Sequence, residues 1–137
     1  MTLGVDDSVE LAGYLEGEKL ARLYSTADVF ALPTSWYEGF PTVILEAMAA
    51  GLPIVTTRSR GPADHLIEGQ HALFVPPGSP QELASALKRL LVDSELRTRM
   101  ADANREKVRE FDPDIVAAEY FLALKQIVAA KESDRSM

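Results

Sequence analysis

Two glutamates, Glu38 and Glu46, stand eight residues apart at either side of a predicted helix start. Glu46 is the only charged residue between Gly39 and Arg58, and its neighbours are mostly Val, Ile, Leu, Met and Ala. A carboxylate in apolar surroundings needs hydrogen-bonding partners. The hydroxyl groups of a bound ligand would supply them.

The loop before this helix, residues 33–41, has the composition of an anion-binding turn. It follows a predicted strand, at the edge where open α/β sheets bind ligands. Gly39 allows close backbone approach, and Pro41 fixes the chain for a helix start. The first amides of the helix have no partners within it and favour phosphate. They belong to Thr42, Val43 and Ile44.

Glu46 lies one turn, about 6 Å, beyond Thr42 on the same helix face. A ligand with phosphate at one end and hydroxyl groups further along would fit this stripe. Two plainer alternatives remain: Glu46 pairs with Arg58 or Arg60, or it reaches solvent. Glu38 alone is equally consistent with an exposed loop carboxylate.

Short apolar segments alternate with helical patterns, as in β-α units built round a parallel sheet. About four strands are predicted, at 9–14, 29–33, 53–57 and 72–75. Helices are predicted at 18–27 and at 42–50, the second closed by Gly51 as a C-cap. The expected fold is an α/β domain with a partial parallel sheet flanked by helices and a helical C-terminal segment.

The C-terminal segment begins with Ser79 and Pro80, an N-cap and first helical residue, and Glu82 is placed to return the capping bond. A charged helix at 94–110 should lie on the surface, and a third should open at Asp112-Pro113. Two apolar faces follow from helical spacing. The first helix presents Leu83, Leu87, Leu90 and Leu91, and the third presents Val116, Tyr120, Leu124 and Ile127.

Composition excludes several classes of function. The 137 residues, 47% of them hydrophobic, fit a single domain. A net charge of −7 argues against nucleic acid as a partner. The sequence shows no transmembrane run and no leader pattern, so we expect a soluble, cytoplasmic protein. Without cysteine, and with only His65 and His71, it offers no metal-ligand spacing.

Residues 30–35 and 38–57, which include the motif E-G-F-P-T-V-I-L-E-A-M from Glu38 to Met48, resemble the C-terminal donor-binding domain of the retaining GT-B glycosyltransferases called group 1. The similarity continues through residues 61–69 and 73–78. It implies a Rossmann-like sheet, half of a GT-B fold, and a nucleotide-diphosphate sugar as donor substrate, with no further cofactor.

The resemblance implies a role for each motif residue. Glu38 would be the catalytic-site residue that contacts hydroxyls of the donor sugar, and Glu46 would accept hydrogen bonds from the ribose. The loop beneath the sugar would be shaped by Gly39, Phe40 and Pro41. The diphosphate would be held by Thr42 and Val43.

The resemblance covers roughly the last third of such an enzyme. Two β-α units with basic residues and the acceptor-binding N-terminal domain have no counterpart, so we expect this chain to be inactive alone. A separate chain could supply the missing half, and the full enzyme could attach peripherally to a membrane. We predict that the strand at 9–14 moves beside the strand at 29–33, or that a second copy completes the sheet as a homodimer.

Other polar and aromatic residues carry less weight. Asp64 is expected to cap a helix, and both histidines are expected to be ordinary loop and strand-edge residues. Trp36 and Tyr37 are expected to pack rather than bind. A noncatalytic remnant or interaction module stays an alternative function. A dinucleotide-dependent oxidoreductase lacks its G-x-G-x-x-G motif, and a receiver-type domain leaves the glutamate pair unexplained.

Overall fold

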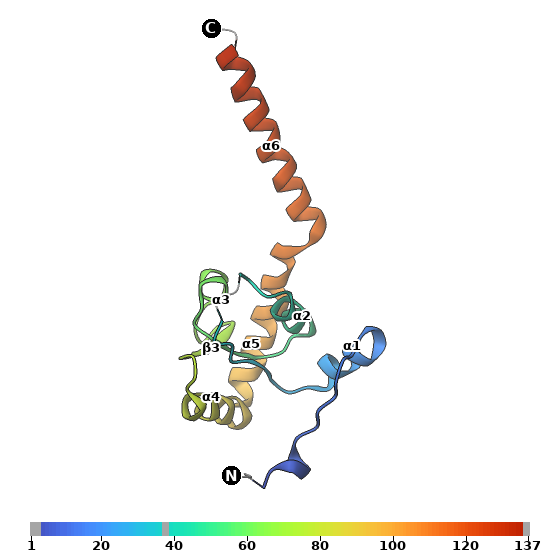
Figure 1. The fold of residues 1–137 in the computed structure, drawn as a ribbon, viewed down its shortest axis with the longest axis vertical. Helices are drawn as coiled ribbons and strands as arrows, with labels where there is room; N and C mark the ends of the chain where they lie inside the picture. The colour runs from blue at the N-terminus through green and yellow to red at the C-terminus, as the bar shows by residue number, and fades with distance from the viewer. Residues whose placement is uncertain (1–3, 37–38, 136–137) are drawn as a thin grey trace.

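Three parallel strands form the centre of the fold, in a computed structural model that describes residues 4–36 and 39–135 (Figure 1). The strands β1 (Phe30–Leu32), β2 (Ile54–Thr57) and β3 (Ala72–Val75) lie side by side in that order. Ala31 is opposite Val55 in the register. These strands confirm the predictions at 29–33, 53–57 and 72–75.

The predicted strand at 9–14 is wrong. This segment follows the 3-10 turn η1 (Asp6–Ser8), has no strand hydrogen bonds and leaves Leu11 93% exposed. It does not pair with β1, so the predicted rearrangement within the chain is wrong too. A strand exists only by pairing, and apolar composition alone cannot provide the neighbour. Pairing with a second copy stays a prediction.

Six α-helices occur in the described residues, and those predicted at 18–27 and 42–50 are confirmed within one residue. Gly51 ends the second of these with φ 73°, the left-handed conformation expected of a C-cap. The short α3 was not predicted, because its sequence R-G-P-A-D-H contains two helix breakers. The helices are α1 (Gly17–Thr26), α2 (Thr42–Ala50), α3 (Arg60–His65), α4 (Pro80–Val92), α5 (Ser94–Lys107) and α6 (Pro113–Arg135), with the 3-10 turn η2 (Val108–Phe111) before α6.

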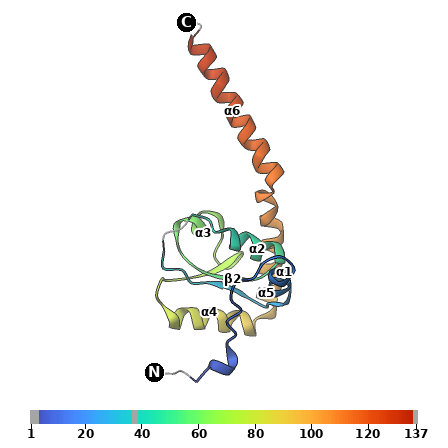
Figure 2. The same cartoon turned by 45° about the vertical axis from the view of Figure 1, so that its right-hand side comes forward.

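The sheet lies between α2 and α4 in Figure 2. Apolar side chains pack on both of its faces. On one face Ile44 and Met48 of α2 pack with Ile54, while on the other Leu90 of α4 packs with Val55. The alternation of neighbouring β2 residues between the two clusters is what a strand covered on both faces requires. The sheet is therefore the middle of three layers.

The C-terminal helices differ in part from their predictions. Leu90 is buried as expected, but Leu91 is 61% exposed and does not belong to the core face. Ser79 precedes α4, yet its side chain makes no capping bond. The charged helix α5 is not merely superficial, because Leu96 and Met100 are buried.

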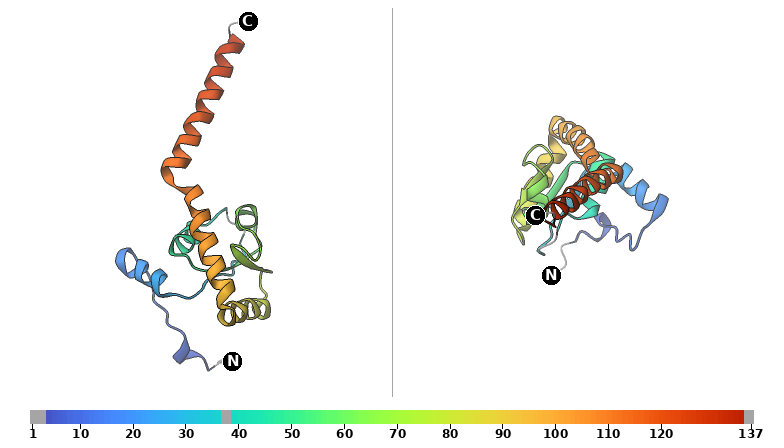
Figure 3. Two further views of the ribbon diagram at one scale, coloured as in Figure 1. Left: turned by 180° about the vertical axis from the view of Figure 1, so that it is seen from behind. Right: turned by 90° about the horizontal axis from the view of Figure 1, so that it is seen from above.

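The long helix α6 extends away from the sheet, as the left view of Figure 3 shows. Its apolar face leaves Tyr120, Leu124 and Ile127 more than half exposed. Among the described residues, no helix combines the length and apolar character needed to cross a bilayer.

Candidate functional site

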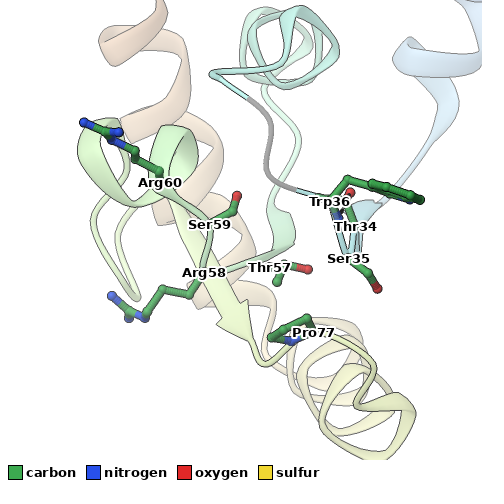
Figure 4. A pocket seen from close by; sticks show the side chains of 8 residues that line it. All are labelled: Thr34, Ser35, Trp36, Thr57, Arg58, Ser59, Arg60 and Pro77. Carbon is green, nitrogen blue, oxygen red and sulfur yellow. Dashed lines mark hydrogen bonds between the residues drawn. The ribbon is translucent and has the colours of Figure 1, made fainter.

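Loops that follow the three strands line a cavity of about 180 Å³, open to solvent, at the carboxyl edge of the sheet (Figure 4). Parallel sheets commonly bind ligands at this edge. The cavity is lined by Thr34, Ser35, Trp36, Thr57, Arg58, Ser59, Arg60 and Pro77. It lies beside the loop that leads into α2.

The start of α2 presents backbone donors next to this loop. Pro41 is the extended N-cap residue, with φ −67° and ψ 133°. The amide of Ile44 donates to the Pro41 carbonyl at 3.0 Å, so the expectation that it is free is wrong. Within residues 4–36 and 39–135, the amides of Thr42 and Val43 have no backbone partner. Both residues are exposed, so an anion could approach these two donors.

Glu46 is exposed and accepts a 2.9 Å hydrogen bond from the hydroxyl of Tyr24 on α1. The alternative pairing with Arg58 or Arg60 is wrong. Arg58 is 3.3 Å from the carboxylate of Glu68 instead. A carboxylate offers about four acceptor positions, so one bond from Tyr24 leaves Glu46 able to accept others.

The contact with Glu46 contributes to a raised pKa of Tyr24. Desolvation, together with the hydrogen bond to Glu46 and the charge of that carboxylate, raises the pKa of Tyr24 to about 12. The phenol therefore stays protonated at neutral pH and acts as a donor to Glu46.

Phe40 anchors the motif loop against two elements distant in sequence. Its ring centroid lies 4.8 Å from that of His65 and 5.3 Å from that of Phe111. Gly61 approaches the same loop from α3, because a Cβ on Gly61 would overlap the carbonyl of Gly39 and lie 2.6 Å from the Phe40 nitrogen. Glycine is the one residue that allows this approach without displacing the loop.

The family described as glycosyl transferases group 1 matches residues 2–107, well over half of the chain. The chain belongs to the group 1 glycosyl transferases. Its similarity to the lipopolysaccharide core biosynthesis glycosyltransferase LpsE of Rhizobium meliloti is 33% identity over 130 residues, 94% of this chain and 36% of LpsE. Similarity to an exopolysaccharide phosphotransferase of Streptomyces coelicolor is 32% identity over 98% of this chain and 14% of that protein.

A solved structure of sucrose-phosphate synthase from Thermosynechococcus elongatus has the same arrangement, with a TM-score of 0.82 and 32% identity. The match covers 92% of this chain and 32% of that one. The chain thus spans about a third or less of these relatives. The fold is that of a fragment of the C-terminal part of a GT-B glycosyltransferase, as expected from the sequence.

The motif residues that the glycosyl transferase resemblance singles out are only partly described. Glu38, to which the resemblance gives the catalytic role, lies outside the described residues, as does Tyr37. The structure places Gly39, Phe40 and Pro41 on one loop. It then places Thr42, Val43 and Glu46 along the first turns of α2.

The structure also shows where Asp64, Trp36 and His71 lie. Asp64 lies in the last turn of α3, so the expectation that it caps a helix start is wrong. Trp36 is 79% exposed at the cavity rim and does not pack over the sheet. His71 is buried just before β3, and its Nδ1 accepts a 3.1 Å bond from the Ile67 amide. Among the described residues, no three His, Asp or Glu side chains gather as metal ligands would.

Four residues have structural contacts that the sequence analysis does not predict: Tyr24, Thr57, Gly61 and Asn104. Asn104 is fully buried in α5, and its Nδ2 donates to the Leu52 carbonyl at 2.8 Å and the His71 carbonyl at 3.0 Å. A signal existed, because Asn104 continues the four-residue spacing of Leu96 and Met100. The other three depend on contacts between separate elements, which no local pattern encodes.

Proposed function

We propose that this chain is the donor-binding part of a glycosyltransferase that transfers a sugar from a nucleotide diphosphate to an acceptor with retention of configuration. In this proposal the amides of Thr42 and Val43 hold the diphosphate, and Glu46 accepts bonds from the ribose hydroxyls. Glu38 contacts the donor sugar, while Gly39 and Phe40 shape the loop beneath it.

One observation carries the proposal: an exposed carboxylate stands one helical turn beyond two available amides at the start of α2. Amide donors suit phosphate, and the remaining lone pairs of Glu46 suit a diol. A similar structure supports the same ligand class. The HepE protein of Anabaena, 25% identical with a TM-score of 0.66 over 77% of this chain, was solved in complex with UDP and glucose.

The test is titration of the 137-residue chain with UDP, GDP and ADP and with their sugar conjugates, followed by NMR amide shifts. We expect saturable shifts at Thr42 and Val43 with one of the three bases. Glu46→Ala should weaken binding about 10-fold or more, because the ribose bonds involve a charged acceptor. Glu95→Ala, an exposed carboxylate on α5, is the matched control. Equal binding by Glu46→Ala and the parent chain would remove the ribose contact.

A noncatalytic module of the same fold is the second candidate. Two contacts favour it: Glu46 already has Tyr24 as a partner, and Arg58 is directed toward Glu68 rather than toward α2. A diphosphate bound by amides alone would be weakly held, because its charge would be little neutralised. No saturable binding of any nucleotide at millimolar concentration would favour this second candidate.

A further inference from the structure

Two buried hydroxyl groups at the cavity lack hydrogen-bond partners among the residues that the structure describes. Thr57 is 3% exposed, and within the described residues neither its Oγ1 nor Oγ of Ser59 has a hydrogen-bond partner. The neighbouring hydroxyl of Thr56, by contrast, donates to the Leu32 carbonyl at 3.1 Å. A buried hydroxyl without a partner is destabilising, so two at one site require an explanation.

The orientation of the charged side chains around the cavity indicates which class of ligand these hydroxyls would bind. In Figure 4 the oxygen of Thr57 points across the cavity toward Ser35, while Arg58 and Arg60 point away from it. Arg58 is held there by Glu68 at 3.3 Å and by the Phe74 ring, 4.5 Å from its guanidinium carbon. The groups that face the cavity are therefore neutral and favour a neutral, hydroxyl-bearing ligand over a phosphate.

We propose that this cavity binds one sugar ring through the hydroxyls of Thr57 and Ser59. The proposal rests on the proposed function for the presence of a sugar substrate. Each hydroxyl can donate one bond and accept others, which matches the hydroxyls of a sugar. Both residues line the cavity while their hydroxyl oxygens are buried, so in this proposal each side chain changes rotamer to reach the ring.

Thr57→Val separates ligand binding from folding. Valine keeps the shape of threonine and removes the hydroxyl, so the fold should be as stable as the parent or more stable. Sugar affinity should fall about 3- to 10-fold, the effect of one lost hydrogen bond. Ser59→Ala should act similarly, and Thr98→Val on the exposed face of α5 is the control.

The full chain is titrated with D-glucose, D-galactose, D-mannose and N-acetylglucosamine, and separately with UDP, UDP-glucose and the other nucleotide sugars. Trp36 is the only tryptophan of the sequence and lies at the cavity rim, so its fluorescence reports on this site. If the bound ring is the sugar of the donor, Thr57→Val weakens binding of the nucleotide sugar but not of the nucleotide alone, and the free sugar competes with the nucleotide sugar. If the bound ring belongs to a second substrate, the free sugar still binds when the nucleotide sugar is present at a saturating concentration.

One outcome would overturn the cavity proposal and leave the proposed function standing. In it, nucleotide binding depends on Glu46, but Thr57→Val changes the affinity of no free sugar and of no nucleotide sugar. Free-sugar binding that Thr57→Val weakens, without any nucleotide binding, would overturn the proposed function and support the cavity. The cavity proposal would also be overturned if Thr57→Val and the parent chain bound every sugar with equal affinity.

Discussion

The hydroxyl of Tyr24 donates a hydrogen bond of 2.9 Å to Oε2 of Glu46 and so ties α1 to α2. The bond orients the carboxylate without occupying all of its lone pairs. Glu46 can therefore accept the bond from Tyr24 and still have lone pairs for a ligand, so the two roles are compatible. In the proposed function, the bond holds the carboxylate in one direction before the nucleotide sugar binds, which would lower the entropic cost of binding.

Tyr24→Phe should weaken nucleotide binding about 2- to 10-fold, because it removes one hydrogen bond that orients Glu46. The ring should stay in place, since its packing against Phe30 at 6.1 Å between centroids does not involve the hydroxyl. The measurement is an NMR titration with the nucleotide that binds best. Tyr14→Phe is the matched control, because Tyr14 bonds only to the nearby Glu16 among described residues. Tighter binding by Tyr24→Phe would mean that the bond competes with the ligand.

Asn104→Ala should lower the free energy of unfolding by about 2–3 kcal/mol, because two carbonyls in the interior lose their donor. These are the carbonyls of Leu52 and His71, which precede β2 and β3. Asn104 thus joins α5 to both segments. Urea denaturation measures the loss.

Arg99→Ala, on the exposed face of the same helix, is the control for Asn104→Ala and should change stability by less than about 0.5 kcal/mol. An equally small change in the two variants would show that the hydrogen bonds of Asn104 contribute little to stability.

Stability should decrease as pH falls below about 6.5, the ordinary pKa of histidine. Burial, reinforced by the charge of Lys107, lowers the pKa of His71 in the folded chain. The unfolded chain therefore binds a proton first, and stability present above pH 6.5 is lost as pH falls through the folded pKa. Urea midpoints between about pH 7 and 5 test this, because most carboxylates titrate at lower pH.

His71→Gln should flatten that pH dependence, since glutamine does not titrate and its oxygen can accept the bond from the Ile67 amide. His65→Gln is the comparison, because His65 is exposed at the end of α3, although one side of its ring contacts Phe40 and Phe111. An unchanged slope in His71→Gln would assign the effect to other groups.

The parts of the fold that depend on local sequence could be predicted, and the parts that depend on distant contacts could not. The strands at 54–57 and 72–75, and α2 with its Gly51 cap, follow from apolar runs bounded by Pro or Gly. The segment at 9–14 has a similar composition but no neighbouring strand. The partner of Glu46 depends on where α1 packs, and sequence spacing alone does not determine that position.

Gly61→Ala should displace the loop at Gly39 and Phe40, because the added Cβ would overlap backbone that cannot rotate away. Nucleotide affinity should fall about 10-fold, on the order of one lost hydrogen bond to a charged group. Shifts of the Gly39 and Phe40 amides detect the displacement, and titration detects the loss. Ala63→Gly, in the same short helix, is the control for a change in helix propensity. Binding by Gly61→Ala at the parent affinity would show that the loop tolerates the shift.

Phe40 and Phe111 should be energetically coupled, since their rings lie 5.3 Å apart and both contact His65. In a double-mutant cycle of Phe40→Leu and Phe111→Leu, the interaction should be about 0.5–1.5 kcal/mol, measured by urea denaturation. Phe121→Leu is the control, because Phe121 is 58% exposed on α6 and should not couple to Phe40. Because Phe111 ends η2, a measurable interaction would mean that the loop proposed to hold the donor is coupled to the turn that leads into α6. Additive effects of the two substitutions would show that the loop and η2 are energetically independent.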